Sequence, residues 1–198
     1  MDIQLLQSNI ERFISLNQDE IDFLISKVVI KKLRKRQYFL QAGEWCRYQG
    51  FVNKGCLRTY EIDEKGAEHV VLFTPEDWWV GDLYSFYTAE PSKVNIEAME
   101  DCELFIFDKD SLEEIYTHIP KMERFFRLLM QNALIALSRR MMSSMTQTTL
   151  ERYCDFIQRY PEIEQRVPNH QIAAYLGVKP ESLSRIRKQY LQSDKKTS

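Results

Sequence analysis

The spacing of apolar residues changes twice along the chain, and these changes separate helical from strand-forming parts. Apolar positions before about residue 28 and after about residue 107 recur every three to four residues, as in amphipathic helices. Between Val28 and Phe107, short apolar runs alternate with turn residues. This pattern predicts about seven or eight short strands in a small antiparallel barrel or jelly roll. We therefore expect a mixed α+β chain in which helices flank the barrel.

Individual turns and caps follow from the residues at the ends of these runs. Asn53-Lys54-Gly55 and Asp63–Gly66 lie between β-rich runs, which predicts two hairpin turns. Asn17 is a plausible N-cap for an early helix. Later helix starts are predicted at Asp108 or Asp110, at Pro120, and at Thr148 or Thr149.

A long helix is predicted from Lys121 to about Gln147, because no glycine or proline interrupts this stretch. Its apolar stripe, called here the seam, suits either coiled-coil pairing of two copies or packing on the barrel. We favour a homodimer. The seam consists of Phe126, Met130, Ala133, Leu137 and Met141.

The aromatic segment at 73–97 interrupts the strands. Gly81-Asp82-Leu83 is expected to open a short helical turn there, and a helix N-terminus in a barrel mouth suits an anion or small ligand. The alternative is that the aromatic side chains simply close the end of the barrel. The candidate ligand-binding residues are Trp79, Gly81, Asp82, Leu83, Ser92 and Lys93.

The segment Val167–Tyr190 predicts two short helices joined by a tight turn at Gly177. Pro180 suits the first turn of the second helix, and Leu183 and Ile186 return its apolar side to the first. This is the spacing of a helix-turn-helix, whose second helix enters the DNA major groove. An ordinary helical hairpin with a solvated charged face is the alternative. Candidate DNA contacts are Asn169, His170, Lys179, Glu181, Ser182, Arg185, Lys188 and Gln189.

Composition narrows the possible classes of protein. The 198 residues are 44% hydrophobic and 28% charged, an ordinary globular mix, and no apolar run has the length of a bilayer span. The first residues lack the features of a secretory signal, so we expect a cytoplasmic location and no membrane. Four scattered cysteines and three dispersed histidines suggest neither a zinc site nor a disulfide framework. With no nucleophile–base set, metal set or phosphate loop, an enzyme is not expected.

Charge is distributed unevenly along the chain. The overall net charge is −2, but residues 167–198 hold six cations and two anions, and the other 166 residues hold 21 basic and 27 acidic side chains. A basic terminal part on an acidic body is expected if only that end meets nucleic acid. The alternative for Lys195 and Lys196 is that they form a lysine-rich tail that only increases solubility.

The order of these parts resembles the Crp/Fnr family of bacterial transcription regulators over about residues 10–190. QIAAYLGVKPESLSRIRK looks like the family's helix-turn-helix, with Glu181, Ser182 and Arg185 at its usual base-reading positions. GCLRTYEIDEKGAEHVVLF resembles the central hairpin strands, and GDLYSF the start of the ligand-binding cassette. The resemblance implies double-stranded DNA and a second copy of the chain as partners, with RNA polymerase as a further candidate partner.

Departures from the family pattern limit what carries over. Ser92 stands at the position of the arginine that holds a cyclic phosphate, Asp82 replaces the usual ribose-binding glutamate, and Lys93 lacks an arginine fork. These differences argue against a cyclic nucleotide, so no cofactor is assigned. The barrel either binds a different small effector or has none. The iron–sulfur branch needs an N-terminal cysteine cluster, but the first cysteine is Cys46. Pro180 replaces a guanine-reading arginine, and a full two-stranded wing is not expected after Tyr190.

We therefore predict three parts: a jelly-roll effector-type domain at 1–119, a dimerisation helix at 120–146, and a helix-turn-helix domain at 147–198. The predicted function is a homodimeric regulator that binds a pseudo-palindromic DNA site through the major groove. The alternative is a ligand-binding or protein-interaction module whose terminal helices dock a partner protein.

Overall fold

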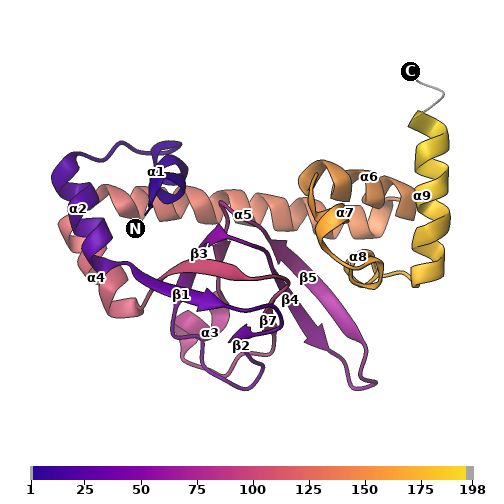
Figure 1. Cartoon of the computed structure of the whole chain (residues 1–198), viewed down its shortest axis with the longest axis horizontal. Coiled ribbons are helices and arrows are strands. Elements are labelled where there is room, and N and C mark those ends of the chain that lie inside the picture. The colour runs from indigo at the N-terminus through magenta and orange to yellow at the C-terminus, as the bar shows by residue number, and fades with distance from the viewer. Residues whose placement is uncertain (1, 195–198) are drawn as a thin grey trace. The chain divides into compact units, whose positions relative to one another are not determined.

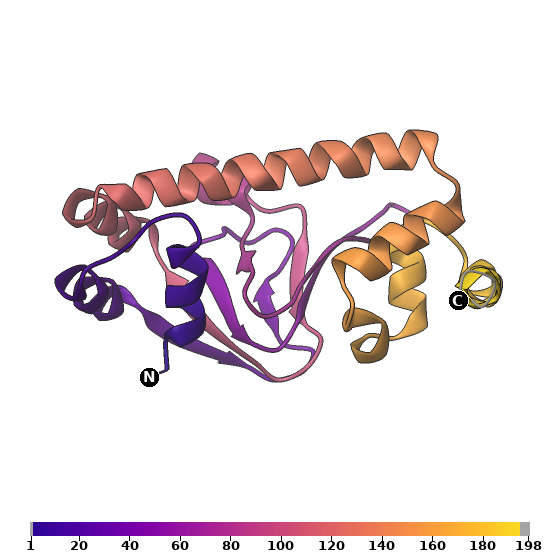
Figure 2. The ribbon, with the colours of Figure 1, turned by 90° about the horizontal axis from the view of Figure 1, so that it is seen from above.

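The computed structural model describes residues 2–194 and divides into two compact units, each of which is described by itself (Figures 1 and 2). The first unit contains residues 1–59 and 73–133, and the second contains residues 60–72 and 134–198. Lys195 and Lys196 lie outside the described residues.

Two short helices precede the strands, in the part of the chain where the sequence predicts helix. They are α1 (Gln4–Glu11) and α2 (Gln18–Lys27). Asn17 caps α2 through a capping box, because its side chain accepts from the Glu20 N–H while Glu20 accepts from the Asn17 N–H. The predicted Asn17 cap is thus confirmed.

Among residues 2–194, eight strands form two four-stranded sheets, with orders β1-β8-β3-β6 and β2-β7-β4-β5. The pairs β1–β8, β3–β8, β3–β6 and β2–β7 are antiparallel. The predicted hairpin turn at Asp63–Gly66 joins the neighbouring strands β4 and β5, with Gly66 at positive φ. The hairpin predicted at Asn53-Lys54-Gly55 is wrong, because this turn leads from β3 to β4, which belong to different sheets. The strands are β1 (Val29–Leu33), β2 (Tyr38–Leu40), β3 (Gln49–Lys54), β4 (Leu57–Ile62), β5 (Glu68–Thr74), β6 (Trp79–Val80), β7 (Asn95–Ala98) and β8 (Cys102–Phe107).

Helices α3 (Leu83–Thr88), α4 (Lys109–His118) and α5 (Lys121–Thr146) complete this part of the chain. Asp108 caps α4, which decides between the two predicted caps, by accepting from the Ser111 N–H at 2.8 Å. The core of the first unit joins strand residues with helix residues that are fully buried. Examples are Ile10 of α1, Phe51 of β3, Phe105 of β8, Ile115 of α4 and Phe125 of α5.

Among its described residues, the second unit holds the end of α5 and four complete helices: α6 (Thr149–Arg159), α7 (Ile163–Arg166), α8 (Asn169–Leu176) and α9 (Pro180–Asp194). They are the orange to yellow ribbons of Figure 1. Thr148 caps α6 through a second capping box with Glu151. The one-turn helix α7 was not predicted, because four residues are too few to show a helical period. The core between helices α6, α7, α8 and α9 consists of Tyr153, Phe156, Tyr160, Ile163, Ile172, Ala173, Leu176, Leu183 and Ile186.

The predicted mixed α+β class, the antiparallel strands and the long helix are confirmed. The boundaries at 119/120 and 146/147 stay predictions. The boundary between the two compact units instead falls within α5, between Ala133 and Leu134.

Candidate functional site

The turn between α8 and α9 is fixed by Gly177. Its φ of 68° is left-handed, a conformation that glycine adopts without the steric cost of a side chain. The Val178 N–H reaches the carbonyl oxygen of Ala173 at 3.0 Å, and the Gly177 N–H reaches that of Ala174 at 3.3 Å. These two bonds form a Schellman motif, which ends α8 sharply and starts α9 three residues later.

Helix α9 has one buried side and one polar side. Leu183 and Ile186 are buried with Ile172 and Ala173 of α8, where the small Ala173 side chain permits a close approach. The polar side is exposed except for Ser182, which is half-buried. We call this side the reading face, consisting of Lys179, Glu181, Ser182, Arg185, Lys188 and Gln189. It carries three cations and one carboxylate, and its long side chains are of the types that contact base edges and phosphates.

Asn169 and His170 are exposed at the N-terminus of α8. The Asn169 side-chain oxygen accepts a hydrogen bond from Arg187 of α9. The Arg187 guanidinium is also paired with Glu164 of α7 at 2.9 Å, and Glu164 accepts from the Tyr153 hydroxyl. Burial raises the pKa of Tyr153 to about 12, so its phenol stays protonated as a donor. This network joins four helices behind the reading face and includes α7, which sequence analysis missed.

The solvent exposure of the α5 seam increases along the helix. Phe126 packs within the chain, with its ring centroid 5.0 Å from that of Trp79 and 5.6 Å from that of Tyr116. Further along, Met130, Ala133, Leu137 and Met141 are exposed, and Leu137 keeps 62% of its surface accessible. Neighbouring Leu134 is 64% exposed. An apolar stripe of this length on one helix is typical of an interface rather than of a solvated face.

The predicted helical turn at Gly81-Asp82-Leu83 exists as the start of α3. Asp82 is its N-cap, since its carboxylate accepts from the Tyr84 N–H at 3.1 Å. At Gly81, an added Cβ would lie 2.6 Å from the amide oxygen of the Gln49 side chain, so a larger residue would require that side chain to shift. Leu83 is exposed next to the cap.

The remaining candidate ligand-binding residues lie in different surroundings. Ser92 is buried, and its hydroxyl bonds both the N–H and the carbonyl oxygen of Val94 at 3.1 Å. Lys93 is exposed. The Trp79 ring belongs to the aromatic core with Phe51, Phe107, Phe125 and Phe126, and its indole N–H donates to Asn9. The structure therefore does not bring Trp79 to the start of α3.

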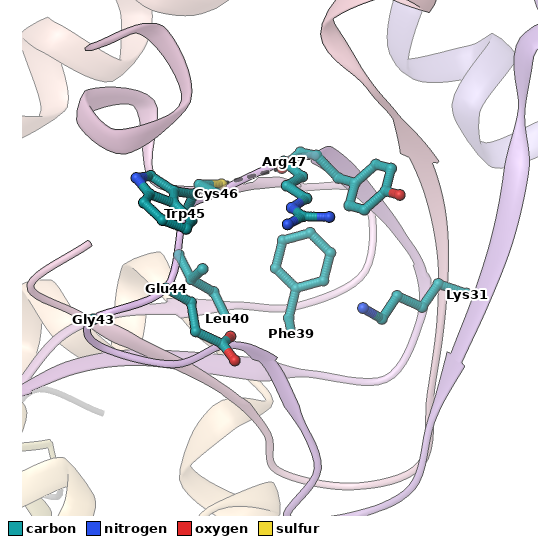
Figure 3. Close-up of a pocket in the computed structure, with 9 residues that line it drawn as sticks. Lys31, Phe39, Leu40, Gly43, Glu44, Trp45, Cys46 and Arg47 are labelled. Atoms are coloured by element: carbon teal, nitrogen blue, oxygen red, sulfur yellow. Dashed lines mark hydrogen bonds between the residues drawn. The ribbon is translucent and has the colours of Figure 1, made fainter. Parts of the chain in front are cut away.

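A pocket of about 410 Å³ lies elsewhere in the first unit, beside β1, β2 and the loop at residues 43–48 (Figure 3). None of the six predicted ligand-binding residues lines it. Sequence analysis missed it because its walls come from separate segments. It is lined by Lys31, Phe39, Leu40, Gly43, Glu44, Trp45, Cys46, Arg47 and Tyr48.

Residues 2–194 contain no group of three or more histidine, cysteine or acidic side chains placed to hold a metal ion. None of the helices in this range combines the length and the apolar character required to cross a membrane.

Comparison with known proteins gives a matching domain family and relatives that match most of this chain. The family description "Cyclic nucleotide-binding domain" matches residues 30–118, the strand-rich part with α3 and α4. The chain is 23% identical to the fumarate and nitrate reduction regulatory protein of Vibrio cholerae over 194 residues, covering 91% of this chain and 76% of the relative. It is 26% identical to an anaerobic regulatory protein of Aggregatibacter actinomycetemcomitans over 184 residues, covering 87% and 71%.

Solved structures show the same fold. FixK2 from Bradyrhizobium japonicum matches with a TM-score of 0.73 at 18% identity, covering 84% of this chain and 86% of that one. The c-di-GMP-responsive regulator CLP of Xanthomonas campestris matches with a TM-score of 0.71 at 15% identity, covering 90% and 93%. The domain match, the named regulators and the order of elements agree, and the chain is similar to transcription regulators of the Crp/Fnr type over most of its length.

Proposed function

We propose that the chain regulates transcription as a homodimer that binds a pseudo-palindromic DNA site, with α8 and α9 as its helix-turn-helix. The observation that carries this proposal is the division of α9 into a buried apolar side and an exposed reading face. A recognition helix needs this division, because one side must be held rigidly while the other enters the major groove.

Individual contacts on the reading face follow from side-chain chemistry. Arg185 is exposed and presents a planar fork that suits the O6 and N7 atoms of guanine. Glu181, one helical turn earlier, is placed to accept from a cytosine amino group. Ser182 and Lys188 contact a base edge or phosphate, and Asn169 and His170 contact phosphate. Pro180 offers no side-chain donor, so specificity depends mainly on Glu181 and Arg185.

When two α5 helices pair through the exposed part of the seam, the dimer keeps its two recognition helices at a fixed separation. Half-sites then lie in successive major grooves, about 34 Å apart. In this proposal residues 1–119 form the effector-type domain, 120–146 the dimerisation helix and 147–198 the DNA-binding domain. A two-stranded wing is not part of the proposal, and RNA polymerase is the candidate protein partner on DNA.

An effector of the barrel is proposed to be a molecule other than a cyclic nucleotide. Two side chains near α3 support this, because the Asp82 carboxylate caps α3 and the Ser92 hydroxyl bonds the Val94 backbone. Lys93, an exposed point charge, lacks the bidentate geometry that holds a cyclic phosphate. An effector acts only if it binds two states of the dimer with different affinities.

The test is binding to a DNA site selected from a random library, measured by fluorescence anisotropy. Arg185→Ala is expected to weaken binding by about 1–3 kcal/mol and to relax preference at one base position. Arg127→Ala on α5 is the matched control and leaves affinity unchanged. Uniform weakening on all sequences would make Arg185 a phosphate contact only.

A salt titration of the same complex separates DNA binding from a protein-docking role of the terminal helices. Because bound cations release counterions from DNA, log affinity should fall linearly with log salt concentration. A negligible slope would contradict the DNA-binding proposal and favour a module that docks a partner protein.

A further inference from the structure

The pocket beside the 43–48 loop gathers more positive than negative charge. Lys31 comes from β1 and Arg47 from the loop, and Glu44 supplies the one carboxylate among the lining residues. Within residues 2–194, neither Lys31 nor Arg47 has an ion-pair partner. Unpaired cations on the walls of one cavity favour an anionic ligand, because pairing is stronger where the ligand excludes water.

Aromatic surface lies beside these charges. Figure 3 shows the Arg47 and Lys31 side chains pointing towards Phe39, with Trp45 on the other side of the open space. The Lys31 ammonium is 5.3 Å from the Phe39 ring centroid, and 55% of the Trp45 surface is exposed. An exposed tryptophan at the rim of a pocket is a stacking surface for a planar ring.

We propose that this pocket is a binding site for a small aromatic carboxylate, with the ring between Phe39 and Trp45 and the carboxylate held by Lys31 and Arg47. The volume of about 410 Å³ lies within the range of small-molecule sites. With Glu44 present, the lining carries one net positive charge, which matches a monoanion and disfavours a dianion such as a phosphate monoester.

The loop that forms the pocket wall is bonded directly to the region of α3 and β7. The Gly43 N–H donates to the Ser92 carbonyl oxygen, and the Ser92 N–H donates to that of Glu44, both at 2.8 Å. The Cys46 N–H donates to the Ser85 hydroxyl at 2.9 Å, and the Asp82 N–H donates to the Cys46 sulfur at 3.4 Å. A ligand that orders the loop therefore also protects backbone amides of residues 82–92 from exchange.

The experiment is isothermal titration calorimetry of the full chain with 2-naphthoate, and with neutral 2-naphthylmethanol as the uncharged probe. Naphthoate is expected to bind saturably, while naphthylmethanol binds at least about tenfold more weakly. Lys31→Gln and Arg47→Gln should each weaken naphthoate binding by about tenfold. Lys32→Gln, which removes the neighbouring exposed lysine of β1, is the matched control and leaves binding unchanged.

Three results would overturn the proposal. In the first, naphthoate gives no saturable heat in calorimetry and does not protect the backbone amides of residues 43–48 from hydrogen exchange. Another is equal affinity for the neutral probe. The third is binding that Asp82→Asn weakens and the two cation substitutions do not, which would move the ligand to the start of α3. Since no DNA is present in these measurements, their outcome is independent of the DNA-binding proposal.

Discussion

Arg58 of β4 and Glu97 of β7 form a buried ion pair within the first unit. Their side chains are only 7% and 12% exposed, and the Arg58 Nε and Nη2 atoms lie 2.9 Å and 2.6 Å from one Glu97 oxygen. Glu97→Ala leaves the guanidinium buried without this carboxylate. We expect a loss of about 3–5 kcal/mol in the free energy of unfolding, measured by urea denaturation.

The control for this prediction is Lys32→Ala, which removes a lysine from an ion pair with Glu103. The Lys32 side chain is 76% exposed, so its loss should change stability by less than about 1 kcal/mol. The double substitution Arg58→Met with Glu97→Leu should recover much of the lost stability. If Glu97→Ala and Lys32→Ala lowered the free energy of unfolding equally, burial of the unpaired Arg58 guanidinium would carry no extra cost, which would contradict the prediction.

Predictions about single residues were confirmed where the interaction is local in sequence. Asn17, Asp82 and Asp108 cap helices that begin at the next residue, so the side chain and the amide it bonds are neighbours on the chain. The pocket at Lys31 and Arg47 was missed because its walls meet only after the strands pair. No local pattern reports such a meeting.

Gly177 is the residue on which the α8–α9 turn depends. An added Cβ would meet nothing within 4 Å, so substitution costs backbone strain rather than a clash. Gly177→Ala should lower the stability of the terminal helices by about 1–2 kcal/mol, since its φ is left-handed. Gly177→Asn should cost less, because asparagine tolerates this conformation. Thermal unfolding followed by circular dichroism measures both, and equal costs would contradict strain as the cause.

The start of α2 is expected to respond to pH through Glu20. A hydrogen bond from Lys121 of α5, followed by one from the Asn17 N–H, holds the pKa of Glu20 below its ordinary value of 4.5. Because the folded-state pKa is lowered, the stabilisation is present above pH 4.5 and is lost as pH falls through the folded-state pKa. The difference in Tm between the wild type and Glu20→Gln should therefore shrink below pH 4.5.

A matched control for Glu20 is Glu113→Gln, which neutralises an exposed carboxylate on α4. Its effect on Tm should be small at neutral pH, since Glu113 caps no helix. A Glu20→Gln effect that persists undiminished far below pH 4.5 would show that shape, rather than charge, stabilises this capping box.

At the level of elements, the length of a segment decided how well the sequence predicted it. The 26-residue α5 repeats its period many times, and its predicted start and end agree closely with Lys121–Thr146. The four-residue α7 completes one turn only and follows Pro161, so nothing in the sequence distinguishes it from a loop. The partners of Phe126 were also unpredictable, because its aromatic neighbours come from β6, α4 and α5.

For the whole molecule, the proposed homodimer is expected to pair through the exposed part of the α5 seam. Leu137 and Met141 are 62% and 56% exposed, and one turn of helix separates them. Leu137→Glu would place a charge at the centre of a paired interface and is expected to raise the dimer Kd by about two orders of magnitude. Sedimentation equilibrium measures this change.

The matched control is Asn132→Glu, which adds the same charge to an exposed position about 140° around α5 from Leu137. Because that side of the helix faces away from the seam, the dimer Kd should stay unchanged. A Leu137→Glu dimer of normal affinity would exclude the seam as the interface.

If Leu137→Glu instead gives a folded monomer, its affinity for a pseudo-palindromic site should fall to that of a single half-site, since linked recognition helices gain affinity from effective concentration. Undiminished affinity of that monomer would show that one α9 is sufficient and that pairing has another role.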